Sequence, residues 1–403
     1  MLDILYLAHD VTDPAIARRL LALKTGGARV TLAGFRRGDA RPVDSDFIEL
    51  GLTRDGRFGQ RIAVVAMATA ALRRKLRGIP APDVILARNL EMLALANRAN
   101  AIFGGRAAIV YECLDIHRLL LRRDAAGHAL RAAEQYLGRN VRLLITSSPA
   151  FIENYFKPVS RLEAPVMLLE NKVFEPEGVP NASMRALPPR PGESFRGEPF
   201  RIGWFGALRC RKSLQLLAKF TRLMEGRYEI VLRGRPAYSE FPDFDTFVEN
   251  EPFMSFHGPY RNPDDLADIY SEVQFSWSID FFEEGENSSW LLPNRLYEGC
   301  RYGAVPIAMA GTETARFIRE KQIGLVLERD DGEALAGLMA DMTPALYQAA
   351  RDRVARVDPG TWTFGRTDCE ALVSRLAALR GSVPTTGSIH AISQTTLSKG
   401  EQP

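Results

Sequence analysis

The 403-residue sequence has little cysteine and no long apolar run. Its four cysteines (Cys113, Cys210, Cys300 and Cys369) lie far apart without a CxxC pair, which argues against a zinc site or disulfide framework and favours a reducing compartment. No apolar stretch reaches the ~18 residues that a membrane-spanning helix needs. The first residues resemble a strand and lack the basic segment and apolar core of a signal peptide. We therefore expect a cytoplasmic protein, with any membrane contact peripheral.

Sequence signatures of several enzyme classes are also missing. The chain has no GxxxxGKS/T motif, which argues against a P-loop, and no strand-linked GxGxxG, which argues against a Rossmann dehydrogenase. His, Asp and Glu are scattered, and no DxD-type pair follows a predicted strand. The sequence therefore predicts neither a metal nor another cofactor.

The chain carries a small positive charge, +3 formally, with a pI of about 8.6. This is far from the strongly basic balance of nucleic-acid-binding proteins. Residues 72–77 form a basic cluster, for which two interpretations stay open. It is the solvated end of a helix, favoured by the helix dipole, or a patch for anionic lipid head groups.

Short apolar runs alternate with helical patterns along both halves, which predicts an α/β fold with parallel sheets covered on both faces. The expected strands are 4–8, 29–35, 84–87, 108–112, 143–146, 166–169, 200–205, 228–232, 253–256, 273–279 and 305–308. The expected helices include 62–77, 90–100, 130–137, 149–156, 213–224, 263–270, 293–301 and 367–379. We predict two doubly wound, Rossmann-like domains, 1–174 and 199–355. Residues 175–198, rich in proline and glycine, form a linker, and 381–403 a disordered tail.

A glycine-rich strand end in the second half is followed by cations. Gly206, Arg209 and Lys212 stand just before a predicted helix. Glycine allows close backbone approach, while basic side chains and helix N-terminal amides bind anions. Because cations at a helix N-terminus oppose the dipole, an offsetting anion such as a diphosphate is expected. The alternative is a solvated basic first turn.

A second motif spans residues 292–307. Pro293 opens a helix, Gly303 ends it, and an apolar strand follows. Glu298 falls among residues expected to pack against the sheet, where an unpaired carboxylate is costly. Its partner is therefore a ribose hydroxyl or a structural arginine.

These passages resemble GT-B glycosyltransferases of the large retaining family (family 4-like) that builds bacterial polysaccharides, above all exopolysaccharide transferases of succinoglycan assembly. The similarity covers most of the chain: strand 4–8, the strand end 144–148, the crossover 169–173, the loop with Gly206, Arg209 and Lys212, and the motif with Glu298. The resemblance implies an N-terminal acceptor domain, a C-terminal nucleotide-sugar domain and a segment, 356–380, that crosses back to the first domain.

The resemblance also implies roles for individual residues. Glu298 would bind the donor ribose, Arg209 and Lys212 the diphosphate, and the amides near Asn294 the diphosphate or sugar. The donor would be a UDP-sugar and the acceptor a lipid-linked saccharide at the inner membrane face. One departure is clear: the family's second glutamate, eight positions earlier, is Trp290 here. Either Glu284 or Glu286 takes that role, or the sugar is recognised differently.

Candidate acceptor residues follow strands of the first half. Asp115 and His117 resemble the family's acid/base or orienting groups in location, and a histidine near a carboxylate can deprotonate a hydroxyl. His9 and Asp10 follow the first strand, and Arg88 and Asn89 follow another; we expect them to line the acceptor site. For each, a structural role is the alternative, and Asp13 is expected only to cap a helix.

The sequence thus predicts a glycosyltransferase that moves a sugar from a nucleoside diphosphate to a hydroxyl of a lipid-linked saccharide in exopolysaccharide synthesis. Arg209 and Lys212 would stabilise the departing diphosphate while Asp115 or His117 assists the acceptor. Two alternatives remain: a GT-B-like sugar-nucleotide epimerase, and a non-catalytic GT-B subunit of an assembly complex. The missing upstream glutamate keeps the second alternative open.

Overall fold

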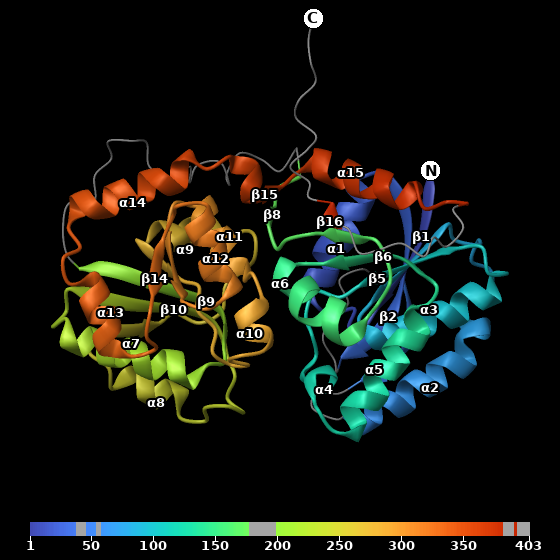
Figure 1. Ribbon diagram of the computed structural model, residues 1–403, viewed down its shortest axis with the longest axis horizontal. Helices are drawn as coiled ribbons and strands as arrows, with labels where there is room; N and C mark the ends of the chain where they lie inside the picture. Colours follow the sequence, from blue (N-terminus) through green and yellow to red (C-terminus); the bar gives the residue numbers. More distant parts are fainter. Residues whose placement is uncertain (38–45, 54–57, 177–198, 382–390, 393–403) are drawn as a thin grey trace, which may run out of the picture. The chain divides into compact units, whose positions relative to one another are not determined.

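Parallel sheets organise both halves of the chain. The computed structural model describes residues 1–37, 46–53, 58–176, 199–381 and 391–392. The chain divides into two units, one of Met1–Glu170 with Gly365–Pro403 and one of Asn171–Phe364 (Figure 1).

The sheet of the first unit has the strand order β16-β7-β6-β5-β4-β1-β2-β3, with every pair parallel. Its strands are β1 (Leu2–Ala8), β2 (Ala28–Arg37), β3 (Phe47–Thr53), β4 (Val84–Arg88), β5 (Ala108–Glu112), β6 (Val141–Thr146), β7 (Val166–Leu168) and β16 (Ala391–Ile392). The central strands β4 and β5 are buried along their whole length, as expected for a sheet covered on both faces.

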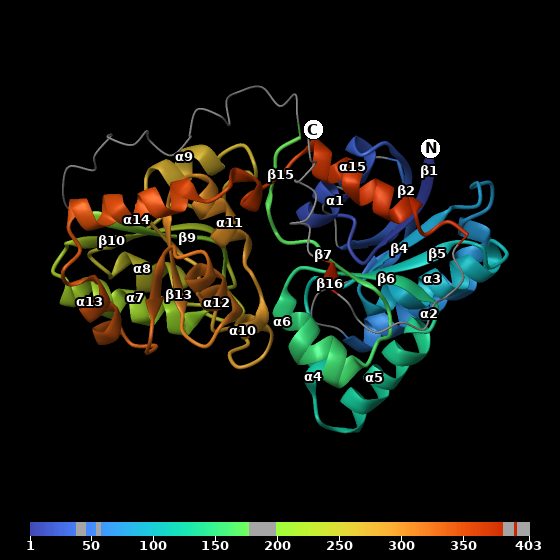
Figure 2. The ribbon, with the colours of Figure 1, turned by 45° about the horizontal axis from the view of Figure 1, so that its top comes forward.

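Helices cover both faces of this sheet. They are α1 (Pro14–Thr25), α2 (Phe58–Lys75), α3 (Leu90–Ile102), α4 (Arg118–Leu121), α5 (Ala125–Gly138), α6 (Pro149–Phe151), the π-helix η1 (Ile152–Ser160) and α15 (Arg366–Ala377). Figures 1 and 2 show α1 and α15 on one face and α2, α3 and α5 on the other. α15 packs closely on α1: a Cβ added at Gly26 would lie 2.3 Å from the Cys369 carbonyl oxygen.

The sheet of the second unit has the order β11-β10-β9-β12-β13-β14, again all parallel. The strands are β9 (Phe200–Leu208), β10 (Tyr228–Pro236), β11 (Met254–Phe256), β12 (Phe275–Trp277), β13 (Val305–Met309) and β14 (Leu325–Leu327). The helices are α7 (Arg211–Leu223), α8 (Phe244–Glu249), α9 (Leu266–Ser271), α10 (Asn287–Trp290), α11 (Asn294–Arg301), α12 (Glu313–Glu320), α13 (Gly332–Met339) and α14 (Pro344–Arg356).

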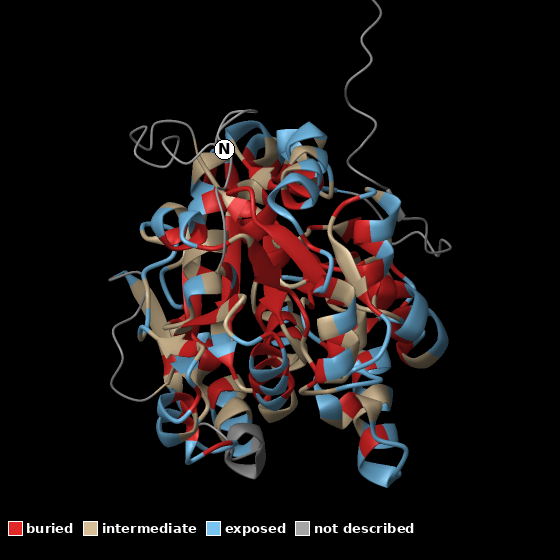
Figure 3. Cartoon of the chain, turned by 90° about the vertical axis from the view of Figure 1, so that its left-hand side faces the viewer, coloured by how far each residue is buried: buried red, intermediate tan, exposed pale blue. Residues whose placement is uncertain are grey.

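Alternation along β9 divides the core of this unit. Phe200, Ile202 and Trp204 pack on one face with residues of α7, α8 and α13. Phe205 points to the other face and packs with residues of α9. Figure 3 shows the buried strands between helices whose outer surfaces are exposed.

The unit boundaries differ from those expected from the sequence. Residues 171–174 belong to the second unit, because β8 (Val173–Phe174) pairs with β15 (Thr363–Phe364). Residues 356–364 also stay there, since Trp362 is buried among residues of α11 and α12. The segment that joins the first unit therefore begins at Gly365. Most of the predicted linker and tail lies outside the described residues, although Ala391–Ile392 within that tail form β16.

A buried carboxyl group of the first unit is hydrogen-bonded to two tyrosine hydroxyls. Glu134 in α5 is fully buried and accepts hydrogen bonds from the hydroxyls of Tyr111 (3.0 Å) and Tyr155 (2.6 Å). Burial raises the pKa of Glu134, and the hydrogen bonds offset only part of this effect. The folded chain therefore holds this proton to a higher pH than the unfolded chain does.

We expect Glu134→Gln to become more stable relative to the wild type as pH rises. The raised pKa of Glu134 stabilises the folded wild type fully at pH values below the pKa in the unfolded chain, about 4.5. This stabilisation is lost as pH rises through the higher pKa in the folded chain. Between these two pKa values the free energy of unfolding of the wild type falls by up to about 1.4 kcal/mol per pH unit, whereas that of Glu134→Gln does not. Urea unfolding of both proteins at pH 5 and pH 8 measures the difference; an equal difference at both values would contradict the expectation.

Candidate functional site

The connectivity of the second sheet marks one place for a ligand. The chain runs from β9 outward to β10 and β11, then returns to the other side of β9 to form β12, β13 and β14. The carboxyl ends of β9 and β12 therefore flank the point where strand order reverses, the usual ligand position in open parallel sheets. Gly206 and Arg209 lie at one of these ends, and Asp280 follows the other.

Glycines allow a close backbone approach at this edge. Gly206 has φ +108°, and the neighbouring Gly234 on β10 has φ +132°. A Cβ at Gly234 would lie 1.9 Å from the Gly206 carbonyl oxygen, so this close approach of the two strands requires glycine at position 234. A Cβ at Gly206, by contrast, would meet only the Tyr260 hydroxyl, at 3.9 Å.

Arg209 is held by the segment that follows β12. Its guanidinium donates to Asp280 Oδ2 at 3.0 Å and lies over the Phe282 ring, 4.7 Å from the centroid. Burial opposes the charge of Asp280, but Arg295, Arg209 and the Phe282 N–H together keep its pKa below the ordinary value. Asp280 is therefore ionised at neutral pH.

Lys212, in the first turn of α7, has a similar environment. Its Nζ lies 2.7 Å from Glu284 Oε2, pairs with Asp330, and stands 4.5 Å from the centre of the Phe281 ring. Partial burial disfavours the charge of Lys212, but the two carboxylates outweigh it and raise its pKa. Both predicted diphosphate cations are thus paired with carboxylates.

Glu298 lies buried in α11, as the sequence motif indicated. Its carboxylate accepts from Asn262 Nδ2 at 2.7 Å and from the Tyr270 hydroxyl at 3.3 Å. Desolvation, reinforced by the Glu298 charge, raises the pKa of Tyr270 well above its ordinary value, so this phenol remains a donor. Two of its donors within the protein are thus an amide and a phenol, whereas the sequence analysis named a ribose hydroxyl or a structural arginine.

The remaining donor-side candidates lie on neighbouring helices. Asn294 is the first residue of α11 and is partly buried. Glu286 is exposed just before α10, whereas Glu284 contacts Lys212. Trp290, at the position of the family's second glutamate, ends α10 and is partly buried.

The first sheet has the same reversal between β1 and β4, and all four predicted acceptor residues lie there. His9 and Asp10 follow β1, Arg88 ends β4, and Asn89 precedes α3 with φ +73°. Asp10 accepts from the backbone N–H and hydroxyl of Thr12 and pairs with Arg37 at 3.2 Å.

Behind this edge lies a buried ionic cluster. Glu112, fully buried at the end of β5, accepts from Arg19 Nε at 2.6 Å, Arg88 at 3.1 Å and the Tyr6 hydroxyl at 3.2 Å. Arg88 is therefore held from within the unit.

His9 is largely buried, and its Nδ1 has no hydrogen-bond partner. Burial, followed by the charge of Arg88, lowers its pKa to about 4, against the opposing pull of Asp13 and Glu91. His9 is therefore a neutral imidazole at physiological pH.

We expect the imidazole of His9 to stay neutral from pH 8 down to about pH 5, because its pKa is lowered to about 4. Histidine side-chain NMR across this range measures the protonation, with His9→Gln used to assign the signal. A His9 titration near pH 6.5 would contradict the expectation.

The predicted acid/base residues follow β5 and are both exposed. His117 caps α4, its Nδ1 accepting from the Leu119 N–H at 3.3 Å. Asp115 lies two residues earlier on the same segment. Asp13 caps α1 through the Ala15 N–H, which confirms that part of the sequence analysis.

The sequence analysis missed several residues around the strand reversals of the two sheets, namely Asp280, Asn262 and Asp330 in the second unit and Arg19 and Glu112 in the first. Asp280 and Glu112 had a detectable signal, since both stand at predicted strand ends, where site residues gather. Asn262 and Asp330 lie in loops far along the chain from Glu298 and Lys212, and only the folded sheet brings them together.

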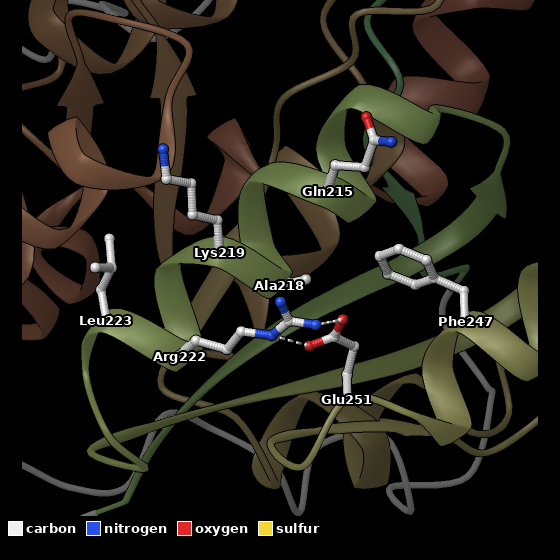
Figure 4. Close-up of a pocket in the computed structure, with 7 residues that line it drawn as sticks. All are labelled: Gln215, Ala218, Lys219, Arg222, Leu223, Phe247 and Glu251. Atoms are coloured by element: carbon white, nitrogen blue, oxygen red, sulfur yellow. Dashed lines mark hydrogen bonds and ion pairs between the residues drawn. The ribbon is translucent and has the colours of Figure 1, made fainter.

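A separate hollow of about 590 Å³ lies along the C-terminal half of α7 (Figure 4). Its cations are neutralised in place: Lys219 pairs with Glu333 at 2.8 Å, and Arg222 pairs with Glu251. This hollow lies away from the strand ends that carry Arg209 and Lys212, and we assign it no role in ligand binding.

The described residues contain neither a membrane-spanning helix nor a cluster of metal-ligating side chains. No helix there is both long enough and apolar enough to cross a membrane. Nor do three or more His, Cys, Asp or Glu side chains of those residues gather where they could hold a metal ion.

The chain is similar to known proteins over nearly its whole length. It is 61% identical over 406 residues to the succinoglycan biosynthesis protein ExoL of Rhizobium meliloti (strain 1021), covering 99% of each chain. No protein-family model matches the sequence.

Solved structures share the fold at low sequence identity. Sucrose-phosphate synthase from Thermosynechococcus elongatus superposes with a TM-score of 0.68 at 15% identity, covering 94% of this chain and 98% of that one. Anabaena HepE in complex with UDP and glucose gives 0.63 at 14% identity, covering 94% and 100%. These matches confirm the predicted two-sheet GT-B architecture. The chain therefore belongs to the ExoL family of succinoglycan biosynthesis proteins and has the GT-B glycosyltransferase fold.

Proposed function

We propose that the chain is a glycosyltransferase that moves a sugar from a nucleoside diphosphate to a saccharide hydroxyl during exopolysaccharide synthesis. The observation that carries the proposal is the grouping of Arg209, Lys212 and the buried Glu298 near the strand reversal of one sheet. Two cations suit a diphosphate, and a carboxylate suits the ribose hydroxyls. The kinship with a succinoglycan biosynthesis protein supports this class of reaction.

The donor is proposed to be a UDP-sugar that binds without a metal ion. HepE, which shares the fold, was solved with UDP and glucose, which supports this choice. Arg209 and Lys212 stabilise negative charge on the departing diphosphate, and such stabilisation is commonly the largest catalytic contribution.

The acceptor is proposed to bind at the strand reversal of the first sheet. His9, neutral and with an unpartnered Nδ1, accepts a hydrogen bond from an acceptor hydroxyl there. Asp10, Arg88 and Asn89 line the same edge. Asp115 or His117 supplies the base that takes the hydroxyl proton.

Calorimetric titration of UDP, GDP and ADP into the purified protein tests the donor site. One nucleotide should bind clearly, and Lys212→Ala should weaken it by roughly 100-fold, as expected for losing a charge-assisted contact. If none of the three nucleotides binds, the transferase proposal fails and the non-catalytic subunit of an assembly complex takes its place.

The protein is also proposed to work in the cytoplasm, at the surface of the inner membrane, on a lipid-linked acceptor. Arg73 and Arg74 in the last turn of α2 and Arg77 just after it are exposed, while Leu72 and Leu76 are buried. Exposed arginines near an anionic surface contribute about 1 kcal/mol each.

We expect the double variant Arg73→Gln/Arg74→Gln to bind anionic vesicles roughly 30-fold more weakly than the wild type, from the loss of about 2 kcal/mol. Co-sedimentation with phosphatidylglycerol vesicles measures this. The control, Arg98→Gln/Arg106→Gln, removes two other exposed arginines of the same unit. Equal losses in both variants would mean a general charge effect and no defined membrane patch.

A further inference from the structure

The segment that follows β12 supplies partners to both proposed diphosphate cations. Asp280 and Phe282 contact Arg209 through a carboxylate oxygen and a ring. Phe281 and Glu284 do the same for Lys212. Each cation thus has one aromatic ring and one carboxylate from the same segment, so residues 280–284 fix the cations as a pair.

Asp280 is itself held in place. Its side chain is only 9% exposed, and its Oδ1 accepts from the Phe282 backbone N–H at 2.9 Å. Its other oxygen, Oδ2, therefore faces Arg209. Next to it, Arg295 of α11 donates to the Ile279 carbonyl at 3.0 Å, and its charge is among those that favour the ionised Asp280.

We propose that Asp280 and Phe282 are positioning residues, which orient the Arg209 guanidinium for the donor diphosphate before the donor binds. The inference rests on the proposed function. An unrestrained arginine loses much of its rotamer entropy when a ligand fixes it. A guanidinium already set between a carboxylate and a ring has lost most of that freedom in advance.

An opposing role for Asp280 is competition, in which the carboxylate occupies Arg209 and must be displaced by the diphosphate. The geometry favours positioning. The Asp280 side chain is only 9% exposed and is hydrogen-bonded to the backbone, so moving it would take its charge away from Arg209 and Arg295.

The inference also assigns α11 a double role. Arg295 and Glu298 stand three positions apart in this helix, so they share one side of it. Glu298 is the proposed ribose ligand, and Arg295 supports the segment that holds Arg209. One helix thus supports the binding of both the ribose and the diphosphate.

A double-mutant cycle tests the positioning role, read as calorimetric affinity for whichever of UDP, GDP and ADP the wild type binds best. Asp280→Asn and Phe282→Leu should each weaken binding about ten-fold, the loss typical of removing a group that orients a ligand-binding side chain. In an Arg209→Ala background neither substitution should change affinity more than about two-fold, because both act through Arg209. Asp280→Glu should recover part of the loss.

Asp243→Asn is the matched control. Asp243 pairs with Arg211, two residues after Arg209, on the exposed surface, so its replacement should leave affinity within about two-fold. Thermal unfolding of each variant identifies any that are misfolded. If Asp280→Asn is unstable, Phe282→Leu still tests the positioning role, because this substitution removes no buried charge.

The outcomes separate the two proposals. Tighter binding by Asp280→Asn would show a competing counter-ion and overturn the positioning role. Equal losses of nucleotide affinity in the wild-type and Arg209→Ala backgrounds would also overturn the positioning role. So would wild-type affinity in Arg209→Ala together with no binding by Lys212→Ala. Absence of nucleotide binding by the wild type itself would instead remove the proposed function, and the positioning role with it.

Discussion

Glu298→Ala is expected to weaken nucleotide binding about 100-fold and to reduce sugar transfer at least as much, since each lost charge-assisted hydrogen bond is worth roughly 1.5–3 kcal/mol. The carboxylate is buried, and its Asn262 and Tyr270 partners keep it oriented. Titration of the nucleotide and a transfer assay with the natural sugar donor measure the two effects.

Two further variants serve as controls for Glu298→Ala. Glu298→Gln keeps the volume and one acceptor oxygen, so it should fold normally yet bind weakly, which separates ligand binding from stability. Glu320→Ala removes an exposed carboxylate on α12 and should behave as the wild type. Wild-type affinity in Glu298→Gln would remove Glu298 from the donor site.

Glu112→Ala is expected to cost the first unit about 3–5 kcal/mol of stability, because it leaves buried positive charge without a partner. Arg19 and Arg88 both donate to this carboxylate, and their side chains are only 11% and 9% exposed. Urea unfolding measures the loss. Glu153→Ala, which breaks the exposed pair with Lys157, should cost less than about 0.5 kcal/mol.

Acid should reduce the benefit of Glu112. Burial alone would raise its pKa, but Arg19 and Arg88 outweigh burial and leave the pKa below its ordinary value of about 4.5. The stabilisation is therefore complete above that value and is lost as pH falls through the folded one. A cost of Glu112→Ala that stays constant from pH 7 down to pH 4 and below would contradict this.

The sequence predicted the architecture because the strongest signals are local. Buried runs such as 84–87 and 108–112 fell within one residue of β4 and β5, since fully buried parallel strands are continuous apolar segments. By contrast, several elements went unrecognised, among them β3, β14, α12, α13 and α14. β3 has an irregular burial pattern, with partly exposed positions along most of its length, so its hydrophobic periodicity is weak.

The candidate site was predictable in part. Arg209, Lys212 and Glu298 carried their own motif, and the structure adds the contacts that hold them. Those contacts, Asp280 with Arg209 and Asn262 with Glu298, join residues 71 and 36 positions apart. No local pattern encodes such pairs; they arise from the strand order, which places loops of distant origin at the same edge of a sheet.

The packing of α15 against α1 has a consequence for synthesis of the chain. The first unit needs Gly365 and the residues after it, whereas the second unit, Asn171–Phe364, is complete before α15 has been made. Synthesis thus completes the residues of the second unit before those of the first. Until α15 has been synthesised, the α1 surface around Gly26 lacks its cover, so a chain that stops at Phe364 contains every residue of the second unit but lacks part of the first.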